Sequence, residues 1–306
     1  MHITAIDNAL MDILVQVDDA FLATSNLEKG VGNFFSEADL DTIQAALTEM
    51  KVAPGGCGAN TMSLMALLGS ETTFLGKVGN DEFGKHYDEA MKKSGVESNI
   101  IFGEGHTGRA ITFITPDAQR TFALNLGTAN TFTQADLPET IEFLYLSNFI
   151  LTDPQTQPAV LEAVKKAQKV GLDLSDPNVV TANKEFLESF IKEHVDILLA
   201  NELEAEAYTG KQPEAAVHEL AELAEVAIVK IGKEGSLIGH QGSVIHVPAL
   251  VVEAIDSTGA GDAYAAGFLH SYLKGESLEK AGALGAFVAA EVVQQIGARL
   301  DSLPEV

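Results

Sequence analysis

The sequence predicts an α/β protein in which a mainly parallel central sheet is accompanied by a second, smaller β-sheet. Short apolar segments of strand character alternate with helical segments along most of the 306 residues, a pattern that favours parallel strands joined by right-handed crossovers. Between residues 100 and 124 the pattern changes to strand, turn and strand. Because no internal repeat, low-complexity segment or long linker interrupts the chain, we expect one large domain over residues 1–306.

The amino-terminal half begins with two segments of strand character. Residues 2–7 are apolar like a buried strand, and residues 12–17 alternate like a half-exposed strand that can join the small sheet. Ser36 opens a Ser-x-x-Asp helix start, which is close to a capping box. The other elements expected here are helices over 36–50, 60–68 and 81–94, a strand over 72–75, and strands over 110–114 and 120–124 joined by a turn at 116–119.

The carboxyl-terminal half continues the alternation of strands and helices. A hairpin around 239–242 and two closing helices, which begin at Gly261 and Leu278, complete the chain. This order indicates a parallel sheet with right-handed crossovers. The expected strands lie at 143–146, 172–174, 197–199 and 227–231, and the expected helices lie at 160–170, 184–192 and 203–208.

Charge and composition limit the classes of function. The formal net charge of −25 argues against nucleic acid and anionic membranes as partners, because both require a basic surface. A polyphosphate site must then be built from backbone amides, a few Lys or Arg residues and a divalent cation that accompanies the nucleotide. The longest apolar runs are too short to span a bilayer, and the single cysteine, Cys57, excludes an intrachain disulfide and a multi-thiolate zinc site. We expect a cytoplasmic protein.

The most informative motif is Asp-Ser-Thr-Gly-Ala-Gly-Asp-Ala at residues 256–263, where a helix begins after a glycine turn. Gly259 and Gly261 let successive backbone amides converge on one point, and the amino-terminal end of the helix favours an anion such as a phosphoryl group. Because a carboxylate does not help to bind phosphate, we expect Asp262 to accept a proton from an attacking hydroxyl. Taken alone, the residues also fit an ordinary loop in which Asp262 caps the helix.

Two further stretches follow predicted strands. Asn201 and Glu204 stand one helical turn apart, where their oxygens can hold the waters of a nucleotide-bound Mg²⁺; they also fit an N-cap with a capping-box Glu. In the second stretch Lys230 supplies positive charge, and Gly232 and Gly235 let the backbone approach a ligand. The alternative for this second stretch is a simple turn into a hairpin.

These motifs resemble, in order, the signatures of one kinase family. Residues 256–263 resemble the carboxyl-terminal signature of the PfkB carbohydrate kinases, the family of ribokinase and adenosine kinase. Residues 55–60 followed by residues 76–84 resemble its amino-terminal signature, and Asn201-x-x-Glu204 resembles a third motif. The resemblance implies a ribokinase-like three-layer α/β/α fold in which the small sheet is a lid. That lid corresponds here to roughly residues 12–35 and 99–125.

The resemblance also implies ATP-dependent phosphorylation of a primary hydroxyl. Asp262 would act as the base, and the amides of Gly259, Ala260 and Gly261 would form the anion hole. Mg²⁺ would enter with ATP and meet Glu204 through water, and many members also use a monovalent cation such as K⁺, for which Asp256 is the matching position. The remaining implied positions are those for the substrate, Asp12, Gly55, Gly56 and Asn60, and those for ATP, Asn201, Glu204, Lys230, Gly232, Gly235 and Thr258.

The motifs constrain the identity of the substrate less than the reaction. Cys57 stands where ribokinases have a lysine, which speaks against ribose, whereas residues 10–13, 174–177 and 294–299 resemble adenosine-kinase-like members. We therefore expect an adenosine-like nucleoside as the substrate. The alternatives are a sugar kinase of the ribokinase or fructokinase type, and a sugar- or nucleoside-binding protein without turnover. Members of the family occur as monomers or as dimers formed through the lid, and both a monomer and a homodimer fit this sequence.

Overall fold

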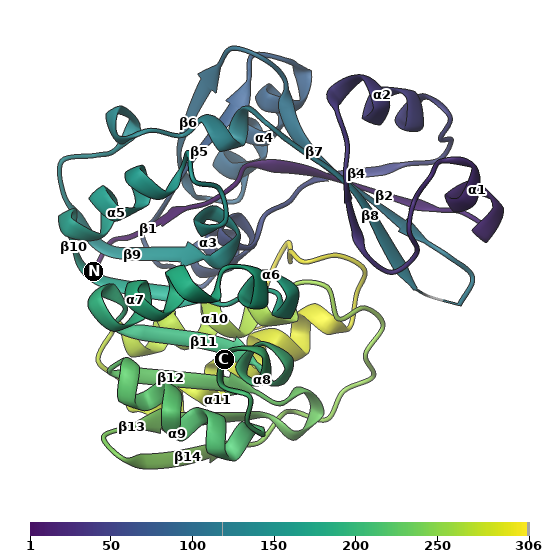
Figure 1. Ribbon diagram of the computed structural model, residues 1–306. Helices are drawn as coiled ribbons and strands as arrows, with labels where there is room; N and C mark the ends of the chain where they lie inside the picture. Colours follow the sequence, from purple (N-terminus) through teal and green to yellow (C-terminus); the bar gives the residue numbers. More distant parts are fainter. Residues whose placement is uncertain (118, 305–306) are drawn as a thin grey trace.

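The large sheet forms the centre of the protein (Figure 1), seen in a computed structural model that describes residues 1–117 and 119–304. Its strands lie in the order β14-β13-β12-β11-β10-β9-β1-β5-β6. Neighbours from β12 to β6 pair in parallel, and β13 pairs antiparallel with both β12 and β14. The bounds are β1 (Ile3–Ile6), β5 (Thr72–Gly79), β6 (Glu97–Gly103), β9 (Ile141–Ser147), β10 (Ala167–Asp173), β11 (Ile197–Asn201), β12 (Val226–Lys230), β13 (Ser236–His240) and β14 (Ser243–Val247).

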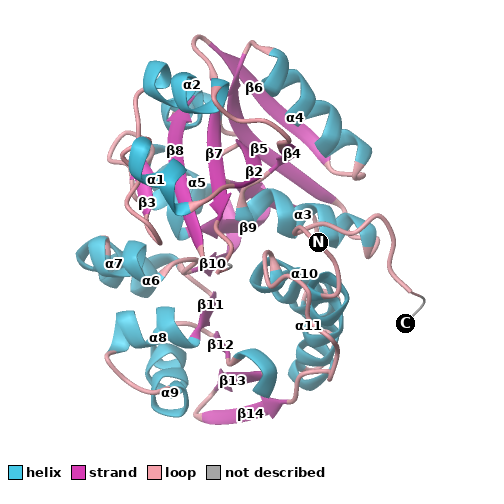
Figure 2. Cartoon of the chain, turned by 90° about the vertical axis from the view of Figure 1, so that its right-hand side faces the viewer, coloured by secondary structure: helices cyan, strands magenta, loops and turns pink. Residues whose placement is uncertain are grey.

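Helices cover both faces of this sheet (Figure 2). One face carries α5 (Gln157–Lys166), α6 (Pro177–Ala182), α7 (Lys184–His194), α8 (Glu202–Thr209) and α9 (Pro213–Leu223). The other carries α3 (Cys57–Leu67), α4 (Glu82–Lys93), α10 (Ala260–Tyr272) and α11 (Leu278–Val293). Within the part of the chain that the structure describes, no helix combines the length and the apolar character needed to cross a membrane.

Alternation along the strands creates a hydrophobic core on each side of the sheet. In β9, Phe143 and Tyr145 pack into the core shared with α3 and α10, whereas Leu144 and Leu146 pack into the core shared with α5 and α7. Successive side chains of a strand point to opposite faces, so strands that are apolar throughout must be covered on both sides. The predicted three-layer α/β/α arrangement is confirmed.

A second sheet stands beside the first, next to β5 and β6 (Figure 1). Its strands lie in the order β3-β8-β7-β2-β4, and α1 (Asp19–Thr24) and α2 (Glu37–Ala45) accompany it. It has its own core, which includes Ile13, Leu40 and Phe113. The strand bounds are β2 (Leu10–Gln16), β3 (Gly32–Phe34), β4 (Lys51–Pro54), β7 (Thr107–Ile114) and β8 (Arg120–Gly127).

The composition of the small sheet differs from the ranges expected for the lid. Strand β4 belongs to it and lies outside both ranges, while residues 99–103 form most of β6 in the large sheet. Ala118, in the expected turn at 116–119, lies outside the described residues. Because β4 pairs antiparallel with β2, the segment that leads to the first glycine motif is itself part of this second sheet.

Two predicted helices end earlier than their sequence patterns indicate. The helix expected over 36–50 stops at Ala45, because residues 51–54 pair with β2. The helix expected over 160–170 stops at Lys166, because the backbone from Ala167 onward pairs with β9 in the large sheet. In both cases strand pairing with a distant segment overrides the local helical pattern.

Candidate active site

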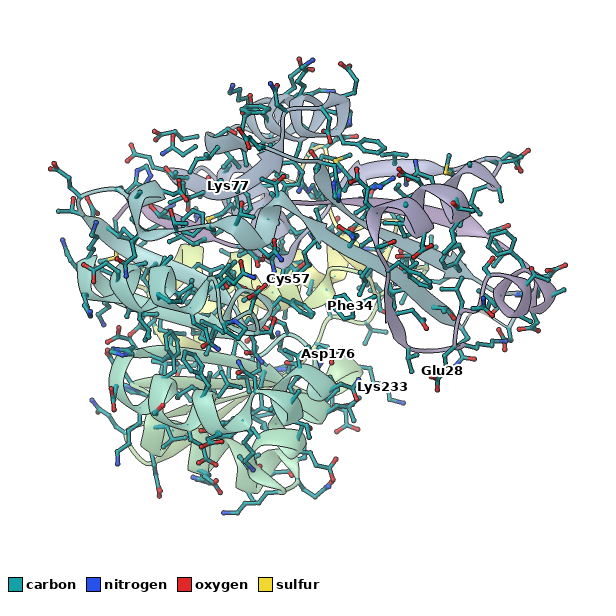
Figure 3. All side chains as sticks on the ribbon, turned by 45° about the horizontal axis from the view of Figure 1, so that its top comes forward. Glu28, Phe34, Cys57, Lys77, Asp176 and Lys233 are labelled. Atoms are coloured by element: carbon teal, nitrogen blue, oxygen red, sulfur yellow. The ribbon has the colours of Figure 1, made fainter. Side chains whose placement is uncertain are left out.

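Polar side chains gather where the parallel strands of the large sheet end. Asp7 follows β1 directly, and Asp173, Asn201 and Lys230 are the last residues of β10, β11 and β12. The carboxyl ends of parallel strands share one edge of a sheet, which is where ligands bind in open α/β folds. Figure 3 labels Cys57, the first residue of α3, near the middle of the molecule.

Asp262 lies in the first turn of α10 and is 9% exposed. The N-cap of this helix is Gly259, so the alternative in which Asp262 caps the helix is wrong. Asn60 donates a hydrogen bond from Nδ2 to Asp262 Oδ2 over 3.0 Å. Burial raises the pKa of Asp262 to about 7, with a further rise from the charge of Asp173, against the opposing effect of the Asn60 hydrogen bond.

The turn before α10 requires its glycines for different reasons. Gly259 has φ 76°, and a Cβ there would lie 2.7 Å from a backbone carbon of Ala298. At Gly261 a Cβ would meet only the Nζ of Lys230, at 3.2 Å. The Lys230 ammonium therefore lies beside the amino-terminal end of the helix, where both the amides and the helix dipole favour an anion.

Lys230 is held by a buried carboxylate. Its Nζ donates to Asp173 Oδ2 over 2.7 Å, and the two side chains are 12% and 6% exposed. Burial lowers the pKa of Lys230, but the charges of Asp173 and Glu204 outweigh this effect and raise it above its usual value. The side chain is therefore a fixed cation at the edge where the strands end.

Asn201 and Glu204 form a reciprocal capping box at the start of α8. The Asn201 side chain accepts from the Glu204 amide at 2.8 Å, and Glu204 accepts from the Asn201 backbone at 2.7 Å and from its side-chain amide at 2.6 Å. Glu204 is 2% exposed, and burial together with Asp173 raises its pKa to about 7, although Lys230 opposes this. Each carboxylate oxygen has a second lone pair, so the capping role leaves room for a hydrogen bond from a metal-bound water.

Asp12 and the glycines of the amino-terminal motif lie against each other. A Cβ at Gly55 would fall 2.2 Å from Asp12 Oδ2, so only glycine leaves space for this carboxylate. Gly56 has φ 94°, and a Cβ there would lie 2.7 Å from the carbonyl oxygen of Asn8. Burial raises the pKa of Asp12 to about 6, and the nearby Arg299 guanidinium limits the rise.

Comparison with known proteins decides the family. A model of the family described as pfkB family carbohydrate kinase matches residues 33–306. The chain belongs to the pfkB family of carbohydrate kinases. This confirms the predicted family and its phosphotransferase class, with an alcohol group as the acceptor.

Relatives of this pfkB-family kinase carry both nucleoside and sugar names. A nucleoside kinase from Methanothermobacter thermautotrophicus is 30% identical over 277 residues, which are 82% of this chain and 82% of that protein. A ribokinase from Mus musculus is 30% identical over 265 residues, or 81% of each chain. The solved structure of an adenosine kinase from Sinorhizobium meliloti has a TM-score of 0.89 at 31% identity and covers 98% of this chain and 95% of that one. The chain is therefore a sugar or nucleoside kinase of the pfkB family.

The Asp256 carboxylate of this kinase is already surrounded by donors. Thr258 donates from its amide at 3.0 Å and from its hydroxyl at 2.7 Å, Arg120 Nη2 donates at 2.5 Å, and the Gly297 amide donates at 3.1 Å. Arg120 Nη1 also donates to the Thr258 hydroxyl. Burial raises the pKa of Asp256, but these hydrogen bonds lower it to about 2. Asp256 does not fit the role of a monovalent-cation ligand here, because the Arg120 guanidinium already neutralises its carboxylate.

The two glycines after Lys230 differ in their surroundings. Gly235 has φ 106°, and a Cβ there would lie 2.0 Å from the carbonyl oxygen of Val247, so glycine is needed for the contact with β14. Gly232 has φ 57° and open space where its Cβ would stand. Gly235 therefore serves the hairpin fold, and Gly232 is the one of the pair whose backbone a ligand can approach.

Four side chains of the site are additional to the predicted set. Asp7 accepts from the Gly58 amide and the Ser147 hydroxyl, both at 2.7 Å, and so fixes the start of α3 below the site. Asp173 pairs with Lys230 and Arg120 pairs with Asp256, as described above. The charge of Arg299 acts on Asp12. Asp7 is the last residue of a predicted strand and Asp173 lies one residue before the end of another, so their positions near strand ends could have identified them. Arg299 lies in the stretch 294–299 that resembles adenosine-kinase-like members, but that resemblance assigned it no role, and the sequence holds no comparable local signal for Arg120.

Proposed function

We propose that the chain transfers the γ-phosphate of ATP to a primary hydroxyl of an adenosine-like nucleoside. The observation that carries this proposal is the position of Asp262. A buried carboxylate with a pKa of about 7 directly follows the glycine turn at 259–261, and a fixed ammonium lies beside that turn. A proton acceptor is thereby placed next to a site that favours phosphate.

The chemistry follows from these positions. The substrate hydroxyl oxygen attacks the γ-phosphorus and loses its proton to the Asp262 carboxylate, while the bond between the γ-phosphorus and the bridging oxygen breaks and ADP departs. The amides of Gly259, Ala260 and Gly261 and the dipole of α10 stabilise the charge that develops on the transferred group. Lys230 adds a fixed positive charge beside Gly261.

We assign the grip on the substrate to the residues around Asp12. Its carboxylate can accept hydrogen bonds from two neighbouring hydroxyls, as a sugar diol presents them. Gly55 and Gly56 keep the backbone close, and Asn60 connects this region to Asp262 through the 3.0 Å hydrogen bond. The small sheet would close over the substrate and exclude water, which limits hydrolysis of ATP.

We assign the nucleotide to the opposite side of the turn. No group of three or more His, Cys, Asp or Glu side chains in residues 1–117 and 119–304 could hold a metal ion, so Mg²⁺ would enter with ATP. Asn201 and Glu204 would hold its waters, because the Glu204 oxygens can accept further hydrogen bonds. Gly232 and Thr258 are the other positions that we place along the nucleotide, and Mg²⁺ would neutralise phosphate charge.

Similarity favours a nucleoside over a free sugar. The adenosine kinase from Sinorhizobium meliloti covers 98% of this chain at 31% identity, and an archaeal nucleoside kinase reaches 30%. A ribokinase at 30% identity supports the second candidate, a kinase for ribose or a related sugar. The substrate class follows from measuring ADP release with adenosine, inosine, ribose and fructose side by side, with Asp262→Asn as the inactive control.

The expected outcome is the highest kcat/KM for adenosine. A preference for ribose or fructose would transfer the assignment to the sugar kinases. If none of the four is phosphorylated while isothermal titration calorimetry detects binding, a binding protein without turnover replaces the kinase.

A further inference from the structure

The segment after α11 returns to the active site and brings a single arginine with it. Arg299 Nε donates to Asn60 Oδ1 over 3.0 Å, across 239 residues of sequence. The backbone around it is fixed as well, because Gln295 Nε2 donates to the Arg299 carbonyl at 2.6 Å and the Gly297 amide donates to Asp256 at 3.1 Å. The guanidinium therefore has a defined direction.

Asn60 anchors this guanidinium between two functional carboxylates. Its oxygen accepts from Arg299 while its amide nitrogen donates to Asp262, so neither end of the Asn60 side chain is free to rotate. The positive charge of Arg299 limits the rise that burial causes in the pKa of Asp12. Burial lowers the pKa of Arg299 itself, against the opposing effects of Tyr87, Asp12 and Asp262. The arginine thus faces the region that we assign to the substrate.

One nitrogen of the Arg299 guanidinium is buried without a hydrogen-bond partner in the part of the chain that the structure describes. Among the described residues, Nη2 of Arg299 is the buried side-chain nitrogen or oxygen for which no hydrogen-bond partner is found. Nη1 lies 3.6 Å from the sulfur of Met91, and the hydroxyl of Tyr87, which donates to the Gly55 carbonyl at 2.9 Å, lies near the guanidinium. A buried donor of a charged group is costly to leave unsatisfied, so a ligand oxygen at this position would remove the cost.

We propose that Arg299 is a substrate-binding residue. Its Nη2 donates a hydrogen bond to the oxygen of a ring hydroxyl, and that hydroxyl donates a hydrogen bond to the Asp12 carboxylate. A hydroxyl can donate one hydrogen bond and accept others at the same time, so it can join a carboxylate and a guanidinium that flank it. The ligand class is a furanose with neighbouring hydroxyls, free or as part of a nucleoside. This inference rests on the proposed function, since it names the recognition of that substrate.

The test compares a diol substrate with its deoxy analogue. Wild type, Arg299→Met and Arg299→Lys are assayed with adenosine, 2′-deoxyadenosine and 3′-deoxyadenosine, or with ribose and 2-deoxyribose if ribose is the better substrate. For the diol, we expect Arg299→Met to raise KM about 10- to 100-fold with a smaller change in kcat, because Asn60 can still reach Asp262. For the analogue that lacks the bridging hydroxyl, Arg299→Met should change KM by less than about threefold. Arg299→Lys should retain part of the affinity for the diol that Arg299→Met loses.

Arg109→Met is the matched control, because Arg109 is a buried arginine that pairs with Asp41 at 2.6 Å and with Gln44 at 2.7 Å instead of facing the site. It should leave the ratio of diol to deoxy KM unchanged, and thermal melts check that each variant is folded. An equal rise of KM for the diol and both deoxy analogues in Arg299→Met, or no rise at all, would overturn the role of Arg299 while the kinase assignment stands. If wild type phosphorylates none of these compounds, the proposed function fails and this inference fails with it.

Discussion

The dependence of kcat on pH tests whether Asp262 is the base. Its pKa is raised to about 7 by burial, and only the ionised carboxylate can accept a proton from the attacking hydroxyl. Activity should therefore be lost as pH falls through about 7. With that pKa, the ionised fraction is about 0.9 at pH 8, about 0.5 at pH 7 and about 0.1 at pH 6, so kcat should fall about tenfold between pH 8 and pH 6.

Two other carboxyls titrate in the same range and have to be separated from Asp262. Glu204 has a pKa of about 7 and Asp12 has one of about 6. Asp12 is assigned to substrate binding, so saturating substrate should suppress its effect on kcat. The Glu204→Gln variant removes the second group, and its kcat should retain the acid limb near pH 7 even if its KM for MgATP rises.

The assay is a coupled measurement of ADP release at saturating adenosine and MgATP from pH 5.5 to pH 9. Replacing Asp262 with Asn keeps the size of the side chain and can still accept the hydrogen bond from Asn60, yet it removes the base. General-base catalysis contributes about 10²- to 10⁴-fold, so kcat should fall by that factor with nucleotide binding retained. A variant with unchanged kcat, or a wild-type kcat that is flat down to pH 5.5, would refute the reasoning.

Three further measurements follow from the same geometry. Gly259→Ala should lower the melting temperature by several degrees, because its Cβ would lie 2.7 Å from the backbone of Ala298 at a positive φ. Gly261→Ala should fold normally and raise the KM for ATP, because its Cβ would displace the Lys230 ammonium, which would lie 3.2 Å away. Equal melting temperatures of the two variants would contradict this. In chemical denaturation, Asp262→Asn should gain about 4 kcal/mol of stability at pH 8 and less than about 1 kcal/mol at pH 4. The raised folded-state pKa favours the protonated wild-type carboxyl, and that contribution is present in full only below the unfolded pKa of about 4 and is lost as pH rises through about 7. Replacing KCl with tetramethylammonium chloride should leave the wild-type rate unchanged but slow Arg120→Gln, because removal of the guanidinium exposes Asp256 to a cation. For the same reason, KCl should raise the melting temperature of that variant alone. Activation of wild type by K⁺ would argue against the pairing of Arg120 with Asp256 in place of a cation.

The residues predicted from the sequence are those that lie in local motifs. Asp262 and its glycine turn span a few consecutive positions, and Asn201 and Glu204 are one helical turn apart, so their spacing already implies a shared surface. Arg120 reaches Asp256 across 136 residues, and Arg299 reaches Asn60 across 239. Contacts of that separation depend on the packing of whole elements, which hydrophobic periodicity does not specify.

The errors in the predicted fold have the same origin. Residues 46–50 continue the predicted helical pattern, yet the helix ends before them and the chain goes on to residues 51–54, which form an edge strand because β2 offers a partner for their backbone. Residues 167–170 were likewise expected to be helical, yet they begin β10, an interior strand whose backbone pairs with β9. Long segments with a strong period and a capping residue, such as α4 (Glu82–Lys93) after Asp81, were predicted to within one residue because local capping and burial agree.

The use of arginine in this chain supports a functional reading of the two that were missed. Lysine and arginine together number 19 against 44 acidic residues, and only Arg109, Arg120 and Arg299 are arginines. A solvated surface can be built with lysine, whereas a planar guanidinium is suited to several directed hydrogen bonds from one buried position. Arg120 donates through Nη1 and Nη2 to the loop before α10, and Arg299 donates to Asn60 and retains a buried donor. The protein has a net charge of −25, yet two of its three arginines lie near Asp256 and Asp12. Both positive charges therefore lie in the region where the phosphate and the substrate hydroxyls have to be oriented together.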